Sequence, residues 1–202
     1  MNTKINPSKF HIMSLLLLFV LSIGLTGCFG GRQRAVTNYY VLDYNKATEN
    51  PNLKMTRSFP HTLEIVETTI PRTYNRNQIV VKEQFSKIRY LQNDLWAIRL
   101  YDAVPNVMVE RFKAYNIFQR VDRDLGEINP TYTLETNISN IEMIESDVPL
   151  AFLRMSFSLR ERTTQKIVLS YQNESTKKMY DTSIVYLIQA LNELIMAETD
   201  VF

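Results

Sequence analysis

Two stretches near the end of the chain have the clearest pattern of hydrophobic and polar positions. In AFLRMSFSLRE (151–161) apolar side chains occupy every second position and mostly polar ones fill the gaps, which predicts a half-buried antiparallel strand. TYTLETNIS (131–139) alternates in the same way, and RTTQ (162–165) has the composition of a turn leading into KIVLSYQNES (166–175). We therefore expect a long hairpin, preceded by a strand that presents one face to the core. That face consists of Tyr132, Leu134, Thr136 and Ile138.

Helical spacing appears in two other places. Residues 181–198 carry an apolar stripe consisting of Ile184, Leu187, Ile188, Leu191, Leu194 and Ile195. A second stripe extends to Phe112 and predicts a helix that begins near Trp96, with Asn93 or Asp94 as its cap. Pro105 lies inside this stripe, so we expect a kink or two helices that meet there.

Shorter apolar runs predict the remaining strands, at residues 39–44, 62–70, 77–83, 87–91 and 116–123. We interpret residues 45–61 as a polar connection, and we find no internal repeat. The expected fold is α/β of the α+β type. It has a mixed, largely antiparallel sheet with two helical stretches packed on one face.

The amino-terminal pattern is that of a secretory leader. Lys4 and Lys9 precede a 14-residue apolar run, Ile12 to Leu25, that contains no charge. As a helix this run would be about 21 Å long, which is short of the ~30 Å hydrocarbon core of a bilayer. A basic start followed by a short apolar run and small residues predicts a cleaved signal peptide, residues 1–27.

The single cysteine of the chain directly follows this leader. Leu25-Thr26-Gly27-Cys28 resembles the lipobox of bacterial lipoproteins. That resemblance implies a signal-peptidase motif at Leu25, Thr26 and Gly27, and a diacylglycerol and an N-acyl chain on Cys28. Residues 28–38 would then be the lipidated terminus and its tether, which anchor the protein to a membrane. In the enteric sorting rule an aspartate directly after the cysteine favours the inner membrane, and this chain has Phe29 there. We therefore expect the periplasmic face of the outer membrane, with the inner membrane as the alternative.

Composition limits what the mature chain can do. Removal of residues 1–27 leaves 175 of the 202 residues, enough for one domain, residues 39–202. Without Lys4 and Lys9, 21 basic residues balance 21 acidic ones, so the chain lacks the basic surface of a nucleic-acid-binding protein. One histidine, His61, remains, which excludes sites with several histidine ligands, and we expect it to be solvated.

Candidate chemistry is sparse, and we expect no enzyme, no metal and no cofactor other than the lipid. The sequence contains no G-x-S-x-G, Walker-type, G-x-G-x-x-G or H-E-x-x-H motif. Asp122 and Asp124 are interpreted as solvated. Glu142, Glu145 and Asp147 are placed in the loop between the two long strands. Carboxylates act on glycosidic bonds only when they are held across a cleft, so a hydrolase is a minor hypothesis.

Two features are candidates for contact with a partner or with lipid. Trp96 could line a groove, although a tryptophan at such a position more often anchors its helix to the core. Val148, Pro149 and Leu150 could form an apolar lip, although we favour the alternative of a strand that enters the core.

Several pieces, in order, resemble the ABC-type transport auxiliary lipoprotein family (PqiC-like). They are the lipobox, NYYVLDY at 38–44 with its Tyr-Tyr-x-Leu opening, and RNQIVVKEQFSKIRYLQNDLWAIRL at 76–100. The hairpin and the closing helix follow in the expected order.

The resemblance implies an accessory, docking subunit of an ABC transport system in the cell envelope. Its partners would be an ABC permease and an MCE-domain protein that move lipids or other apolar molecules and so support envelope integrity. The alternative is a structural or assembly lipoprotein with no role in transport. The sequence leaves a homo-oligomer open.

Overall fold

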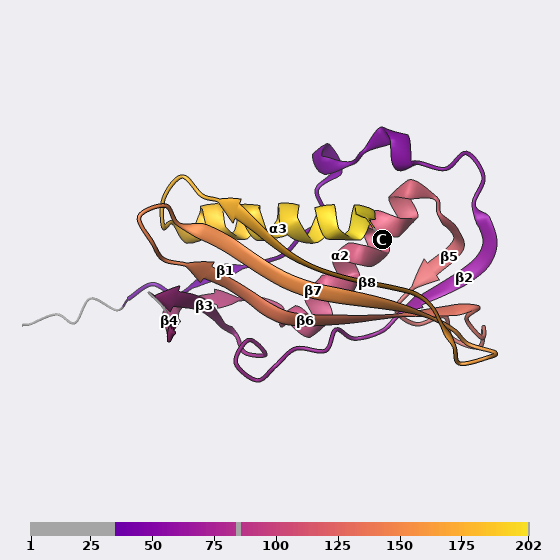
Figure 1. Ribbon diagram of the computed structural model, residues 1–202, viewed down its shortest axis with the longest axis horizontal. Coiled ribbons are helices and arrows are strands. Elements are labelled where there is room, and N and C mark those ends of the chain that lie inside the picture. The colour runs from indigo at the N-terminus through magenta and orange to yellow at the C-terminus, as the bar shows by residue number, and fades with distance from the viewer. Residues whose placement is uncertain (1–34, 84–85, 202) are drawn as a thin grey trace, which may run out of the picture. The chain divides into compact units, whose positions relative to one another are not determined.

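The longest described strand, β6 (Tyr132–Ile144), is the centre of the sheet (Figure 1). The structure is a computed structural model that describes residues 35–83 and 86–201. Along one edge β6 pairs antiparallel with β7 (Leu150–Glu161), and β7 pairs antiparallel with β8 (Ile167–Lys178). The predicted strand and hairpin at residues 131–175 are therefore confirmed.

The other edge of β6 is shared by short parallel segments. β2 (Phe59–Ile65) pairs with its first residues and β3 (Gln78–Glu83) with its last ones. β5 (Phe118–Asp122) extends the sheet beyond β2. On the β3 branch, β4 (Lys87–Trp96) pairs antiparallel with β3, and β1 (Asn38–Tyr40) pairs parallel with β4. Within the described residues the sheet thus has eight strands and is mixed, with long antiparallel and short parallel ladders, as expected.

One irregularity in β6 keeps its apolar side chains on the core face. The pairing with β7 shifts register between Ile138 and Asn140. Because strand side chains alternate between faces, the extra residue reverses the alternation from there on. Leu134 and Ile138 before the shift, and Ile141 after it, are therefore all buried although their numbers differ in parity.

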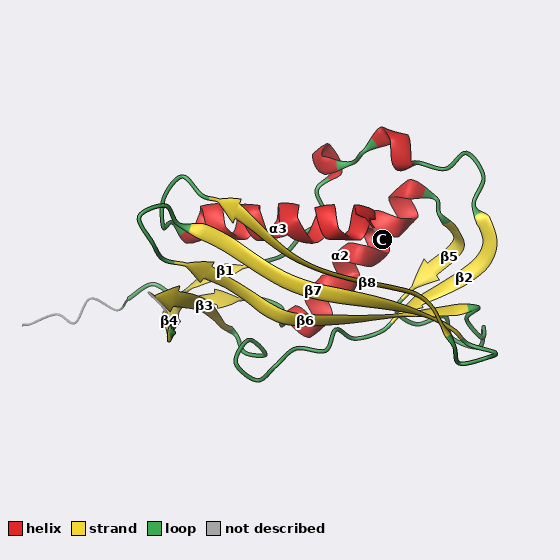
Figure 2. Ribbon diagram, in the orientation of Figure 1, coloured by secondary structure: helices red, strands yellow, loops and turns green. Residues whose placement is uncertain are grey.

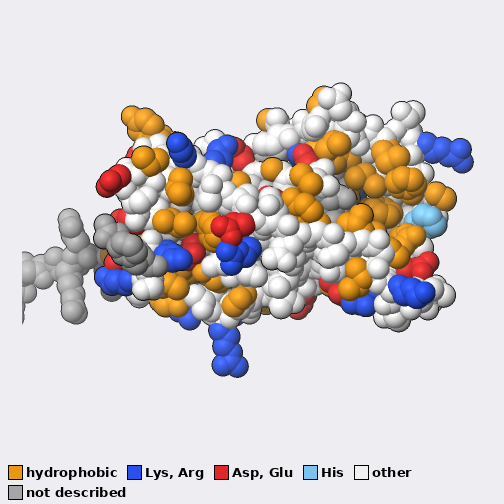
Figure 3. Space-filling view, in the orientation of Figure 1, with side chains coloured by type: hydrophobic (Ala, Val, Ile, Leu, Met, Phe, Trp, Pro, Cys, Tyr) orange, Lys and Arg blue, Asp and Glu red, His pale blue; other side chains and the backbone are white. Residues whose placement is uncertain are grey.

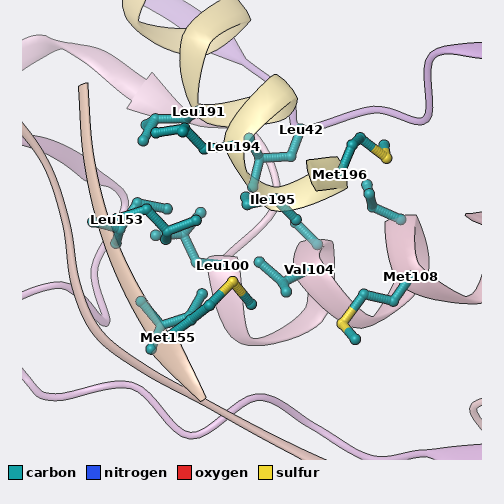
Figure 4. Packing of buried hydrophobic residues seen from close by; sticks show 14 of the residues in the cluster. Leu42, Leu100, Val104, Met108, Leu153, Met155, Leu191, Leu194, Ile195 and Met196 are labelled. Atoms are coloured by element: carbon teal, nitrogen blue, oxygen red, sulfur yellow. The ribbon is translucent and has the colours of Figure 1, made fainter. Parts of the chain in front are cut away.

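Two helices, α2 (Leu100–Tyr115) and α3 (Ile184–Val201), pack on one face of the sheet (Figure 2). Leu153 and Met155 of β7 meet Leu100 of α2 and Ile195 of α3 in the core between the layers (Figure 4). The expected α+β class and the packing of both helical stretches on one face are confirmed. In the part of the chain that the structure describes, no helix combines the length and the apolar character needed to cross a membrane.

The start of α2 differs from the prediction. Trp96 is the last residue of strand β4, and α2 begins at Leu100 with Arg99 as a cap that makes no side-chain hydrogen bond. Asn93 and Asp94 lie within β4. The prediction was wrong because β4 finds partners in both β3 and β1, and these pairings extend the strand beyond residue 91.

Of the two outcomes expected at Pro105, two helices that meet there is wrong, because α2 is one helix from Leu100 to Tyr115, whereas the kink stays a prediction. Proline has no N–H to donate to the carbonyl four residues earlier, here that of Tyr101. The backbone N–H of Thr68 donates to that oxygen at 3.1 Å instead. A neighbouring segment thus satisfies the carbonyl that Pro105 leaves free, and the helix continues.

The connection at residues 45–61 is partly structured. It contains two 3-10 turns, η2 (Lys46–Thr48) and η3 (Pro51–Leu53), each capped by an asparagine side chain, and β2 already begins at Phe59. η2 matters for function because it borders the groove described next.

Candidate functional site

A groove of about 440 Å³ runs along α3. One wall comes from β1 and the residues that follow it, up to Thr48 in η2, and the other from α3. Gln189 and Asn192 are among the polar side chains at its surface. Its apolar lining comes from Tyr39, Tyr40, Val41, Val185, Ile188 and Met196.

The wall formed by β1 is held at both of its ends. Asn38 Nδ2 donates to Asp94 Oδ1 at 2.9 Å, and Tyr40 Oη donates to the same oxygen at 3.0 Å. Burial of the phenol, together with its hydrogen bond to the Asp94 carboxylate, raises the pKa of Tyr40. Beyond the strand, Leu42 is buried beside α3, and Asp43 N–H donates to Asn192 Oδ1 at 3.2 Å.

A buried arginine fixes the far end of this wall. Arg111 of α2 has a side-chain exposure of 1%, and its Nε and Nη2 donate to Asp200 of α3 at 2.7 and 2.6 Å. Nη2 also donates to the carbonyl oxygen of Thr48 at 2.7 Å. One guanidinium therefore joins α2, α3 and η2. We call Arg111, Asp200 and Thr48 the Arg111 clamp.

Tyrosines surround the clamp. Tyr115 Oη donates to Asp200 Oδ2 at 3.0 Å and accepts the N–H of Asn50 at 2.9 Å. Tyr44 Oη donates to Glu49, and burial followed by this carboxylate raises the pKa of Tyr44 to about 12. These bonds hold the segment containing η2 and η3 over α2.

The groove has the character of a binding surface. Its lining is mainly apolar, with amide side chains and the Glu193 carboxylate at its border. The groove is therefore suited to an apolar ligand or surface.

The predicted lipidation site lies outside the described residues, as do Leu25, Thr26 and Gly27. Trp96 is 3% exposed and is part of the core, so a partner could reach its indole only if the side chain left that core. In the predicted lip, Val148 is 50% exposed, Pro149 is buried and Leu150 begins β7. A contact at this lip stays a prediction, and it would depend chiefly on Val148.

The acidic trio does not form one loop. Glu142 lies in β6 and is 1% exposed, because Tyr74 covers it and donates to its carboxylate at 2.8 Å. Burial and this hydrogen bond raise the pKa of Tyr74. Glu145 and Asp147 do lie in the loop, where Glu145 pairs with Arg89 at 2.9 Å. The three carboxylates therefore do not face a common cleft.

The remaining polar candidates have structural partners. His61, expected to be solvated, is half-buried in β2 with its ring edge-on to Tyr132 at 5.5 Å. Asp122 lies 3.7 Å from Lys113, and Asp124 accepts the N–H of Gly126 at 2.7 Å. Across residues 35–83 and 86–201 no cluster of three or more His, Cys, Asp or Glu could hold a metal ion.

The sequence analysis missed the groove and the Arg111 clamp. A signal for Arg111 was present, because it continues the apolar stripe of Val104, Val107 and Met108 on the buried face of α2. A charge on such a face predicts a buried partner. Its partner, Asp200, is 89 residues away in the chain, and nothing local identifies it.

Comparison with known proteins gives the family. The model of the family described as ABC-type transport auxiliary lipoprotein component matches residues 40–200. Among solved structures, protein XCC0632 from Xanthomonas campestris, of family DUF330, superposes with a TM-score of 0.71 at 17% identity, covering 82% of this chain and 91% of its own. An uncharacterized protein superposes at 0.64 with 15% identity, covering 81% and 94%. Both solved structures share the fold of this chain. No curated protein matches this sequence. The chain belongs to the ABC-type transport auxiliary lipoprotein family.

Proposed function

We propose that this protein is a lipid-anchored accessory subunit of an ABC transport system in the cell envelope, and that it docks the transporter's other components rather than catalysing a reaction. The family match over residues 40–200 carries this proposal. The anchor would be the acylated Cys28, at the periplasmic face of the outer membrane. The partners would be an MCE-domain protein and the ABC permease, with lipids or other apolar molecules as cargo.

The fold supports a docking role. A tether of about ten residues reaches at most ~35 Å, so an anchored domain keeps a high local concentration near its membrane. Even a weak contact with a partner then becomes effective. The residues that surround the groove are suited to binding, and Glu142, the one fully buried member of the acidic trio, is covered by Tyr74.

An aromatic cluster of β2, β5 and β6, in which Phe59 is the exposed member, offers a surface for such a partner. Phe59 is 49% exposed, and its ring lies 6.5 Å from that of Phe118, which in turn lies 6.3 Å from Tyr132. Figure 3 shows hydrophobic side chains gathered over β2 and β5, at the right. Apolar patches of this kind are common at protein interfaces.

Crosslinking in living cells tests the proposal. A photoreactive amino acid at Phe59 should capture an MCE-domain protein or a permease subunit, identified by mass spectrometry. The matched control places the same probe at Thr163, in the exposed turn between β7 and β8. Capture of an outer-membrane barrel or of peptidoglycan instead would favour the structural or assembly role and contradict the transport role.

The anchor is tested separately. Cys28→Ser should abolish labelling by radioactive palmitate and release the protein from the membrane fraction. Labelling that persists in this variant would place the acyl site elsewhere.

A further inference from the structure

We propose that the domain rests directly on the bilayer that holds its anchor, through one surface around the first turns of α3. This inference deepens the proposed function and depends on the lipid at Cys28. The surface, which we call the α3 docking surface, consists of the exposed side chains of Tyr39, Val41, Tyr180, Val185 and Tyr186.

These five side chains fall into two groups that border neighbouring hollows along α3. Tyr39, Val41 and Val185 line the α3 groove, while Tyr180 and Tyr186 line a second, neighbouring hollow of about 160 Å³. The two tyrosine rings lie 5.9 Å apart. Two further α3 residues, Gln189 and Glu193, border both hollows and so join them.

The side chains are unusually exposed for their type. Tyr180 is 87% exposed, Tyr39 64% and Val185 62%. In Figure 3 several hydrophobic side chains lie at the left, over the start of α3 and the loop before it, with charged side chains between them. Tyrosine has an apolar ring and a polar hydroxyl, and it is enriched where proteins meet the boundary between headgroups and acyl chains. The composition thus fits the interfacial layer of a membrane.

Charge contributes little to this surface. Lys177 pairs with Glu193. Nearby, Lys178 carries a positive charge and Asp181 a negative one, and the Asp181 carboxylate accepts the N–H of Ser183 at 2.7 Å. A surface that relied on anionic lipids would instead present a cluster of unpaired lysines and arginines. The contact is therefore apolar, and its strength should not depend strongly on salt.

The short tether favours the bilayer over other apolar partners, because it keeps the domain near the membrane. The domain begins at Thr37, nine residues after Cys28, and Tyr39 follows two residues later. Nine residues span at most about 32 Å. The residues that follow the tether are thus part of the docking surface itself, and a lipid on Cys28 would be joined to that surface by no more than this length of chain. A membrane held this close is the partner at the highest effective concentration.

Site-specific fluorescence on the lipidated full-length protein tests this inference. The sulfur of an acylated Cys28 is a thioether, so a cysteine introduced by Tyr180→Cys is the one thiol that an environment-sensitive NBD dye can label. The labelled protein is reconstituted on vesicles of phosphatidylethanolamine and phosphatidylglycerol, with or without a doxyl-labelled lipid as quencher. Thr163→Cys is the matched control, since the β7–β8 hairpin places position 163 roughly 40 Å from the docking surface at ~3.3 Å per residue.

The expected result is blue-shifted emission at position 180, with quenching several-fold greater than at position 163. Raising the salt concentration should leave this difference unchanged. Vesicles that carry the protein but give equal quenching at both positions, or greater quenching at 163, would overturn the inference while leaving the anchor intact. A difference that disappears in high salt would overturn the apolar contact.

Failure of the proposed anchor has a different signature. In that case the protein does not float with the vesicles, and mass spectrometry finds an unmodified Cys28. That result would overturn both the anchor and the membrane contact that depends on it.

Discussion

The two edges of β6 are built in different ways. On the hairpin side, β6, β7 and β8 pair through long antiparallel ladders in which nearly every residue has a partner directly opposite. The other side, which we call the forked side, is formed by residues that come before β6 in the chain. Here β2 and β3 each pair with β6 through only a short parallel ladder, and an isolated bridge between Thr69 and Asn137 lies between the two ladders. The hairpin side is held by many equivalent ladder hydrogen bonds, whereas the forked side depends on a few short ladders and one isolated bridge.

This difference predicts where single substitutions matter. The forked side is joined to the rest by buried polar contacts between residues far apart in the chain, such as Arg111 with Asp200 and Tyr74 with Glu142. A buried group that loses its partner costs the full penalty of its desolvation. An exposed ion pair in a regular ladder can be replaced by water. The forked side should therefore be the more sensitive one.

Asp200→Ala should have the largest effect. It leaves the guanidinium of Arg111 buried with the oxygens of Thr48 and the ring face of Tyr115 as its remaining partners. Removal of one member of a buried ion pair costs about 3–5 kcal/mol of unfolding free energy. Urea denaturation followed by the fluorescence of Trp96, the only tryptophan, measures this loss directly.

A double variant serves as the control. Arg111→Met combined with Asp200→Ala removes the unpaired charge together with its partner, so it should be less destabilised than Asp200→Ala alone. If Asp200→Ala costs less than about 1 kcal/mol, the value typical of an exposed pair, the clamp does not hold the forked side.

Tyr74→Phe should have the next largest effect. The hydroxyl of Tyr74 donates to Glu142 at 2.8 Å, and the amide of Asn140 reaches the same carboxylate only at 3.4 Å. Loss of a hydrogen bond to a charged, buried group costs about 1.5–3 kcal/mol. The same denaturation experiment on Tyr180→Phe is the control, since Tyr180 is 87% exposed and its stability should be unchanged. Equal stability of the two variants would show that Tyr74 does not compensate for the burial of Glu142.

The same contrast explains what the sequence predicted well. The alternation in residues 151–159 and the stripe of α3 gave the correct elements because local pattern and tertiary packing agree there: the apolar positions Leu153, Met155 and Leu191 are all buried. The family was also correctly identified, since its short motifs follow the order of these elements.

The forked side was predicted less well, for physical reasons. Trp96 belongs to β4 because β1, more than fifty residues earlier in the chain, pairs with it. α2 continues through Pro105 because Thr68 supplies the missing donor. Glu142 is buried because Tyr74, 68 residues away, covers it. Each outcome depends on a distant residue that no local pattern identifies. The α3 groove was missed for the same reason, since β1 and α3 lie at opposite ends of the sequence.

Alkaline pH should lower the stability of the segment that contains η2 and η3, by less than the substitutions above. The pKa of Tyr44 is raised from 10.0 to about 12, by burial first and then by Glu49. Both states keep the phenol protonated below pH 10, so its contribution to stability is complete there. Between pH 10 and 12 the unfolded chain loses the proton first, and the contribution is lost as the pH rises through the folded-state pKa.

Tyr44→Phe tests this dependence. The variant should lose about 1 kcal/mol at neutral pH, the net value of one hydrogen bond, and its stability should fall less steeply than that of the unmodified protein between pH 10 and 12. Urea denaturation at a series of pH values gives both quantities. Parallel curves for the two proteins would contradict a raised pKa at Tyr44.

Arg160→Gln, on the hairpin side, should have the smallest effect. Arg160 forms a two-point contact with Glu135, at 2.8 Å through Nε and 3.0 Å through Nη2, which resembles the Arg111 contact in geometry. The Arg160 side chain is 29% exposed and that of Glu135 43%, so water replaces either partner and salt screens the pair. The expected cost is therefore smaller than in any of the destabilised variants above. A double-mutant cycle with Glu135→Gln isolates the pair energy, and high salt should reduce it. The two arginine contacts share their geometry and differ in burial. If the pair energy of Arg160 and Glu135 were as large as the loss of stability in Asp200→Ala, burial would not be the reason that the forked side is the more sensitive one.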